Sequence, residues 1–319
     1  MLSVRQVKRT PGVGIALVAV GAALWGTDAL FRRGLALELP SVEVVFWEHL
    51  LLVLFTLPLI VRGLRIMRGR PWRDWAAIAV VGGGSSVAAT VLLTEAFQHG
   101  DPTTPLLLQK LQPVIVGALA VALLGERLRP RYFAYLALAL LSSYLIAFAD
   151  PGNVTVDRAL PALLGVGAAT LWALGTVLGK RLSAHVPAAE LTGLRFGFGL
   201  PVAALLVIPF GADGQLLAAD PGDAWALLGL ALVPGLIALL LYYHGLRAAP
   251  ATAATIAELS FPLTALVVNA IAFGDRLSST QLAGASLLAV TVTAFGVASR
   301  RGPQAIGVRM QPATGLAGG

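Results

Sequence analysis

The sequence predicts an all-α integral membrane protein with ten transmembrane helices, on two observations. Charged residues make up only 12% of the 319 residues and hydrophobic residues 57%, about half the charge of a soluble protein. Apolar runs near the length of about 20 residues that crosses a bilayer occur ten times along the chain. A soluble chain with so little charge could not cover its surface with polar groups. Soluble enzymes, nucleic-acid binders and disordered proteins are therefore excluded.

The ten predicted spans are separated by short polar connectors, and their ends are uncertain by about 2–4 residues. The spans are 12–31, 43–61, 75–98, 103–124, 131–149, 159–179, 188–210, 223–246, 252–273 and 280–299. No connector is long enough for a soluble domain. Residues 1–11 form an N-terminal segment, and the tail 301–319, which has no long apolar run, is expected to be disordered.

The basic residues predict the orientation in the membrane. If the N-terminus is cytoplasmic, 17 of the 23 Lys and Arg residues fall in inside segments and four in outside segments, and the remaining two, Lys110 and Arg195, lie within helices. Such a bias favours both termini in the cytoplasm and a place in the cytoplasmic membrane. The net charge of +7 is then a sign of topology and not of a nucleic-acid partner.

Sequence signatures of catalysis are missing. The chain contains no cysteine, which excludes disulfides, thiolate metal sites and cysteine nucleophiles. Its four histidines lack ligand spacing, and Gly82–Ser86 resembles neither a phosphate-binding loop nor a dinucleotide fingerprint. No cofactor, metal site or catalytic residue is predicted, so the chain is interpreted as not an enzyme. A membrane-embedded enzyme is the less favoured alternative.

The two halves of the chain, 12–150 and 151–300, resemble each other. The tetrapeptide GERL at Gly125–Leu128 corresponds to GDRL at Gly274–Leu277, a shift of 149 residues. The same shift relates three further pairs: Thr103 with Thr252, Gln109 with Glu258, and Pro113 with Pro262. Each half holds five predicted helices. Because five is odd, the second half enters the membrane from the opposite side, which is the inverted-topology repeat of many secondary transporters.

These motifs resemble the EamA-type proteins of the drug/metabolite transporter superfamily. Each half has a Pro, an apolar run and then Gly-Glu-Arg at Gly125–Arg127 or Gly-Asp-Arg at Gly274–Arg276, and an early Leu-Trp. Asp275 is a mild departure from the family pattern. The resemblance covers about residues 12–300 and implies ten helices in two five-helix repeats. It also implies export of amino acids, other metabolites, nucleotide sugars or drugs.

Lys110 is the clearest candidate for a binding residue, because ionisable groups at membrane depth usually face a cavity or a partner. It lies seven residues into the predicted span 103–124. Its ammonium group is a candidate to bind a carboxylate of a substrate. The alternatives are a structural ion pair or a side chain that snorkels to the interface.

Glu258 is the near counterpart of Lys110 in the span 252–273. It forms a polar stripe at helical spacing with three neighbours, namely Thr255, Pro262 and Asn269. Glu258 is a candidate to bind an ammonium group or to carry a coupling proton, and the alternative is a salt bridge to Lys110 or Arg195. Lys110 and Glu258 together would suit a zwitterion such as an amino acid.

Several other intramembrane residues are candidates for substrate binding or coupling: Gln109, Asp28, Trp25, Trp172 and Arg195. Pairing with a local partner is the favoured interpretation for Arg195, whose repeat mate is Glu48. The two tryptophans occupy matched positions and can stack on a substrate or pack between helices. Pro113 and Pro262 free backbone carbonyls at matched points and are candidate hinges.

The sequence and the resemblance together predict a secondary transporter that moves a small organic metabolite by alternating access. An amino acid or a related compound is favoured as substrate. Export coupled to inward proton movement is what the resemblance favours. The predicted partners are this small molecule, the lipid bilayer and protons. A passive facilitator or channel is the main alternative. The oligomeric state stays open.

Overall fold

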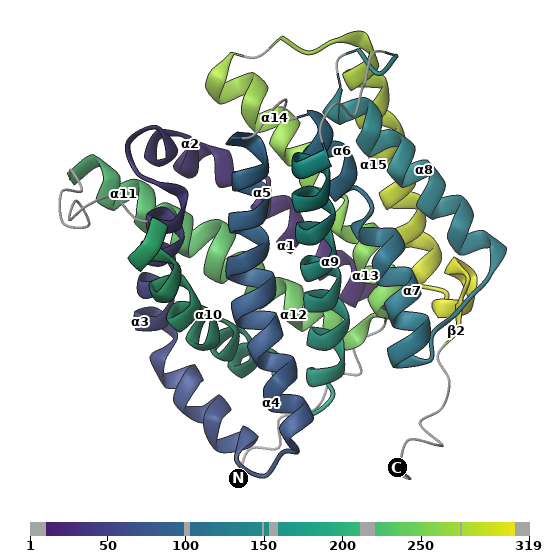
Figure 1. Cartoon of the computed structure of the whole chain (residues 1–319). Coiled ribbons are helices and arrows are strands. Elements are labelled where there is room, and N and C mark those ends of the chain that lie inside the picture. The colour runs from purple at the N-terminus through teal and green to yellow at the C-terminus, as the bar shows by residue number, and fades with distance from the viewer. Residues whose placement is uncertain are drawn as a thin grey trace.

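The computed structural model describes residues 11–98, 103–148, 150–152, 159–210, 221–274 and 276–309 (Figure 1). Ten helical stretches within them are long and apolar enough to cross a membrane, which confirms the ten predicted spans. These stretches are Pro11–Leu35, Ser41–Met67, Trp72–Ala96, Leu107–Leu124, Pro130–Ala147, Ala159–Leu182, Ala188–Pro209, Asp223–Ala248, Ala251–Phe273 and Ser279–Ser299.

Several spans consist of more than one helical element. The first half contains α1 (Pro11–Trp25), α2 (Asp28–Glu38), α3 (Ser41–Met67), α4 (Trp72–Ala79), the π-helix η1 (Val80–Ala88), α5 (Ala89–Gln98), α6 (Thr103–Gln109), α7 (Gln112–Leu124) and α8 (Pro130–Ala147). The second half contains α9 (Ala159–Leu182), α10 (Ala188–Phe210), α11 (Pro221–Leu230), the π-helix η3 (Ala231–Ile237), α12 (Ala238–Ala248), α13 (Ala251–Glu258), α14 (Phe261–Phe273) and α15 (Ser279–Ser299).

The fourth span of each half is broken at the same point of the repeat. Lys110-Leu111 separates α6 from α7, and Leu259-Ser260 separates α13 from α14, again a shift of 149 residues. Pro113 and Pro262 lie in the first turn after each break. A proline has no N–H to donate to the carbonyl four residues earlier but is well suited to a first turn. The predicted spans 103–124 and 252–273 each therefore consist of two helical elements.

The third spans also correspond, because each contains a π-helix, η1 in the first half and η3 in the second. Such segments are rare and are often found at functional sites. The first span is interrupted at Gly26-Thr27, between α1 and α2. A Cβ added to Gly26 would lie 2.8 Å from the carbonyl oxygen of Phe261. The break in the first span therefore packs directly on the start of α14.

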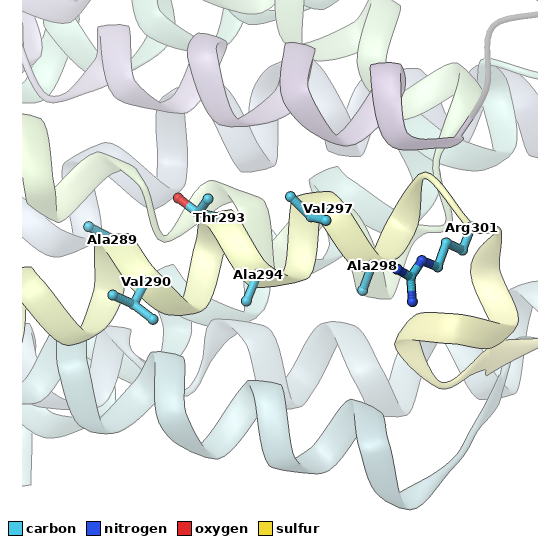
Figure 2. A pocket seen from close by; sticks show the side chains of 7 residues that line it. All are labelled: Ala289, Val290, Thr293, Ala294, Val297, Ala298 and Arg301. Atoms are coloured by element: carbon cyan, nitrogen blue, oxygen red, sulfur yellow. The ribbon is translucent and has the colours of Figure 1, made fainter.

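The chain after α15 is folded up to Arg309. It forms the 3-10 helix η4 (Pro303–Ile306) and the strand β2 (Val308–Arg309), which pairs antiparallel with β1 (Arg127–Leu128). Ile306 and Val308 are fully buried. Residues 301–309 therefore differ from the disordered tail that the composition favours, and residues 310–319 lie outside the described part. α15 packs against α8. The outer face of α15 carries a groove lined mostly by small apolar side chains (Figure 2).

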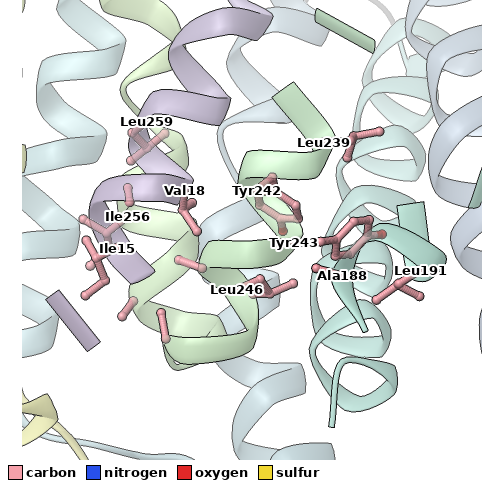
Figure 3. Packing of buried hydrophobic residues seen from close by; sticks show 14 of the residues in the cluster. Ile15, Val18, Ala188, Leu191, Leu239, Tyr242, Tyr243, Leu246, Ile256 and Leu259 are labelled. Carbon is pink, nitrogen blue, oxygen red and sulfur yellow. The ribbon is translucent and has the colours of Figure 1, made fainter. Parts of the chain in front are cut away.

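The two halves are interleaved in the core. α1 packs against α12 and α13 of the second half, and α9 packs against η1 and α7 of the first. A Cβ added to Gly14 would lie 2.8 Å from the carbonyl oxygen of Gly245, so α1 and α12 cross in backbone contact, as small residues permit in membranes. Figure 3 shows Ile15 and Val18 of α1 near Ile256 of α13 and Leu259 of the break that follows it. This interleaving surrounds α13, all of whose residues are buried, with helices of both halves.

Candidate functional site

Glu258, the last residue of α13, is held by three uncharged side chains. Its Oε1 accepts hydrogen bonds from Tyr242 Oη (2.9 Å) and Thr176 Oγ1 (3.4 Å). Its Oε2 accepts a hydrogen bond from Gln112 Nε2 (3.0 Å). Thr176 Oγ1 and Tyr242 Oη are themselves 3.0 Å apart. These four residues, here named the Glu258 cluster, come from α7, α9, α12 and α13 and so from both halves.

Two further candidates lie beside the Glu258 cluster. The Trp25 ring, at the end of α1, lies 5.2 Å from the Tyr242 ring, centroid to centroid. Thr255, one turn before Glu258 on α13, is 1% exposed, and its Oγ1 has no hydrogen-bond partner in the described structure. Because buried hydroxyl groups are normally hydrogen-bonded, the unsatisfied Thr255 hydroxyl is an exception that marks this turn of α13. The Trp25 ring contacts the tyrosine that donates to Glu258, and Thr255 precedes Glu258 by one helical turn.

Lys110 lies in the break between α6 and α7 and is half-buried. No hydrogen bond or ion pair joins its ammonium group to any residue that the structure describes. Glu258 likewise has hydrogen bonds only to Gln112, Thr176 and Tyr242 among these residues. The salt bridge between Lys110 and Glu258, considered above as the structural alternative, is thus not formed.

Arg195 of α10 is bound by hydroxyl groups. Its Nε donates to Ser86 Oγ (2.5 Å), its Nη1 to Tyr243 Oη (3.1 Å) and its Nη2 to Ser85 Oγ (3.4 Å). Both serines lie in the π-helix η1. Tyr243 is adjacent to Tyr242 on α12, so Arg195 supports the helix that presents Tyr242 to Glu258.

Asp28 belongs to a separate ion-pair group. Arg32 Nε lies 2.7 Å from Asp28 Oδ2, and Arg32 Nη2 lies 2.9 Å from Glu48 Oε2. The repeat mates Glu48 and Arg195 therefore have different local partners. Within the described residues, no hydrogen bond or ion pair joins Asp28 to the Glu258 cluster.

The other sequence candidates take peripheral places. Gln109 ends α6, and it is Gln112, one turn later, that reaches Glu258. Trp172 lies on α9, four residues before Thr176. Asn269 lies on α14, beyond the break, and no hydrogen bond joins its side chain to the Glu258 cluster within the described residues. The break has therefore interrupted the stripe predicted from Thr255 to Asn269.

Three of the four residues in the Glu258 cluster are not among the binding or coupling candidates named from the sequence. Gln112, Thr176 and Tyr242 are all polar residues inside apolar spans, which is the signal that could have found them. Gln112 also directly precedes Pro113. The sequence does not show the break between α6 and α7, which separates Gln109 from the residue that reaches Glu258, Gln112.

Glu126 of the GERL motif caps α13. The carboxylate is 1% exposed and accepts from the Ala251 N–H at Oε1 (2.7 Å) and from the Thr252 N–H at Oε2 (3.2 Å). Thr252 Oγ1 also donates to Oε2 (2.5 Å). A carboxylate is favourable at a helix N-terminus, where it satisfies free N–H groups. The first half thus holds both ends of α13, through Glu126 at its start and through Gln112 at Glu258.

Comparison with known proteins identifies the family. The EamA-like transporter family matches residues 12–148 and 159–296. The chain is 33% identical over 290 residues to the riboflavin transporter ImpX of Fusobacterium nucleatum, covering 88% of this chain and 96% of that protein. It is 28% identical over 203 residues to a probable amino-acid metabolite efflux pump of Salmonella typhimurium, covering 58% and 64% of the two chains.

A solved structure has the same fold. A crystal structure at 19% identity matches with a TM-score of 0.71, covering 90% of this chain and 98% of the other. Transporter relatives are consistent with a chain that is not an enzyme. Together with the ten spans, the family match identifies a multi-pass protein of the cytoplasmic membrane. This chain belongs to the EamA-like transporter family.

Proposed function

We propose that the chain is a secondary transporter that binds a small organic metabolite at the Glu258 cluster and moves it by alternating access. One observation carries the proposal: side chains from both halves meet beside the paired breaks of the two fourth spans. Transporters with inverted repeats bind substrates near the membrane midplane at discontinuous helices. A site shared by both halves changes its access when the halves rock against each other.

Riboflavin is the first substrate to test. The relative named a riboflavin transporter matches over 96% of its own length. Riboflavin combines a flat aromatic ring system with a chain of hydroxyl groups. The Trp25 and Tyr242 rings offer aromatic faces to the ring system. Thr255, Gln112 and Glu258 offer polar atoms to the hydroxyl groups.

An amino acid is the second candidate. The ammonium group of Lys110, which has no ion-pair partner in the described part of the chain, favours it. Lys110 would bind the carboxylate of the substrate. Glu258 would bind the ammonium group of the substrate, which would replace one of the three side chains that now donate hydrogen bonds to Glu258. The Salmonella relative named an amino-acid metabolite efflux pump is in line with this choice. Riboflavin carries no charge to match Lys110, so this lysine distinguishes the two candidates.

Coupling to protons is the third part of the proposal. Glu258 is hydrogen-bonded to uncharged groups, so it can bind a proton without breaking an ion pair. A protonated carboxyl group accepts more weakly, which would loosen the hydrogen bond from Gln112 on α7. That bond joins the two halves across the breaks, so proton uptake would free them to move. We propose that protons enter as substrate leaves. A passive facilitator would show no such dependence.

Counterflow in proteoliposomes tests the substrate. Vesicles loaded with riboflavin or with a mixture of amino acids are assayed with wild type, Lys110→Ala and the control Arg65→Ala, which removes an exposed cation of α3. We expect saturable counterflow of riboflavin that changes by less than about threefold in Lys110→Ala. For an amino acid the loss in Lys110→Ala should exceed about tenfold, the value of one charge-assisted hydrogen bond.

Three outcomes would contradict parts of this proposal. Folded protein that moves neither compound class would refute both substrates. Flux that does not saturate and shows no counterflow would identify a channel. If an amino acid is transported, equal losses in Lys110→Ala and Arg65→Ala would remove Lys110 from the site.

A further inference from the structure

Six arginines gather where the chain after α15 meets the loop between α7 and α8. They are Arg127, Arg129, Arg131, Arg300, Arg301 and Arg309, and all are exposed. The fold brings the two segments together, because β1 pairs with β2 and the Arg129 N–H donates to the Gly307 carbonyl (2.9 Å). The one carboxylate in these two segments, Glu126, is engaged in capping α13. Among the described residues, none of the six arginines has a carboxylate partner.

The small sheet places two of these charges face to face. Arg127 is the direct cross-strand partner of Arg309, and like charges in this position destabilise a sheet. The neighbouring pair, Leu128 and Val308, holds the sheet by burial, since Val308 is fully buried. The orientation of the chain in the membrane explains why arginines gather on one side of it. It does not explain why two of them lie opposite each other on paired strands. An anion between the two side chains would offset their repulsion.

An apolar groove runs along α15 toward these arginines. It has a volume of about 610 Å³, and Figure 2 shows its lining side chains in a row along the helix: Ala289, Val290, Thr293, Ala294, Val297, Ala298 and Arg301. From Ala289 to Ala298 the helix rises about 14 Å, which is enough for much of an acyl chain. Arg301 stands at one end of the row. The groove is therefore apolar along its length and cationic at that end.

We propose that this surface, the α15 groove together with Arg127, Arg301 and Arg309, binds one anionic phospholipid. The headgroup phosphate lies against the arginines and an acyl chain lies along α15. Clusters of basic residues at the membrane surface attract anionic lipids in this way. A second copy of the chain fits the surface less well, because a symmetric contact there would bring two sets of unpaired arginines together.

Native mass spectrometry of the purified full chain in detergent tests the proposal. Phosphatidylglycerol is compared with phosphatidylcholine of the same acyl chains. We expect a retained phosphatidylglycerol adduct in wild type and about tenfold weaker binding in the triple variant Arg127→Gln, Arg301→Gln, Arg309→Gln. The matched control Arg62→Gln, Arg65→Gln, Arg68→Gln removes three exposed arginines at the C-terminal end of α3 and should retain the adduct.

A second variant keeps the test valid if the triple variant folds poorly. Ala294→Trp fills the groove from the exposed face of α15 and should weaken phosphatidylglycerol binding while leaving the tail in place. Equal loss in the control triple variant would mean unspecific charge attraction and overturn the proposal. Glycerol phosphate that displaces the lipid equally well in wild type and Ala294→Trp would point to a free anion. Dimers broken by Ala294→Trp would make the groove a contact between copies.

Discussion

Glu126→Ala is expected to abolish transport and to destabilise the folded chain by about 2–4 kcal/mol, because it leaves buried N–H groups without an acceptor. The Glu126 carboxylate accepts from the Ala251 and Thr252 N–H groups and from the Thr252 hydroxyl. It also lies at the N-terminus of α13, where a negative charge is favourable. Losing it frees the helix that ends at Glu258. Thermal unfolding in detergent and counterflow in proteoliposomes measure the two effects.

Two further variants calibrate this prediction. Thr252→Val removes one of the three hydrogen bonds and should cost about 1 kcal/mol. Glu190→Ala removes a carboxylate from the first turn of α10, for which no comparable set of hydrogen bonds is found in the described structure, and should have little effect. If Glu126→Ala and Glu190→Ala unfold at the same temperature and transport equally well, the cap does not hold α13.

Glu258→Gln is expected to separate exchange from coupling. The amide oxygen still accepts from Tyr242 and Thr176, and the Gln112 amide can turn to present its oxygen, so counterflow of the uncharged substrate riboflavin should stay within about threefold of wild type. The amide cannot bind a proton, so accumulation driven by a pH gradient should fall at least about tenfold. Glu258→Ala, which loses all three hydrogen bonds, should lose both activities.

Glu190→Gln is the matched control for this pair, because it neutralises a half-buried carboxylate that no hydrogen bond joins to the Glu258 cluster within the described residues. Accumulation that still follows the pH gradient in Glu258→Gln would exclude Glu258 as the coupling group. Loss of counterflow in Glu258→Gln with the protein folded would instead make Glu258 a substrate ligand that needs its charge.

The spans and the repeat could be predicted from the sequence because both depend on local composition. An apolar run of membrane length has few alternatives to a spanning helix. The shift of 149 residues that relates Pro113 to Pro262 is visible without any structure. The same shift relates the two breaks, but the breaks were not predicted, because two residues such as Leu259 and Ser260 do not change the hydropathy of a run.

The candidate site could be predicted only in part. Glu258, Thr255 and Trp25 were found because each is conspicuous within its own span. Their partners were not, because the donors to Glu258 lie on other helices, and Gln112 lies 146 positions away. The capping role of Glu126 was missed for the same reason: it joins residues 125 positions apart. The folded segment after α15 was not predicted either. Ile306 and Val308 are buried there, but the segment is too short to show a periodic hydrophobic pattern in the sequence.

One measurement tests most directly whether the Glu258 cluster is the transported substrate's site. The chain has no cysteine, so Thr255→Cys carries a single thiol one turn from Glu258. A membrane-impermeant thiol reagent is applied to vesicles of each orientation. The account predicts labelling from either face as the substrate gradient is reversed, and protection by the transported compound. The buried control Thr192→Cys on α10 should stay unlabelled. A Thr255→Cys thiol that is labelled from one face only under every gradient, or is never protected by substrate, would contradict alternating access at this site.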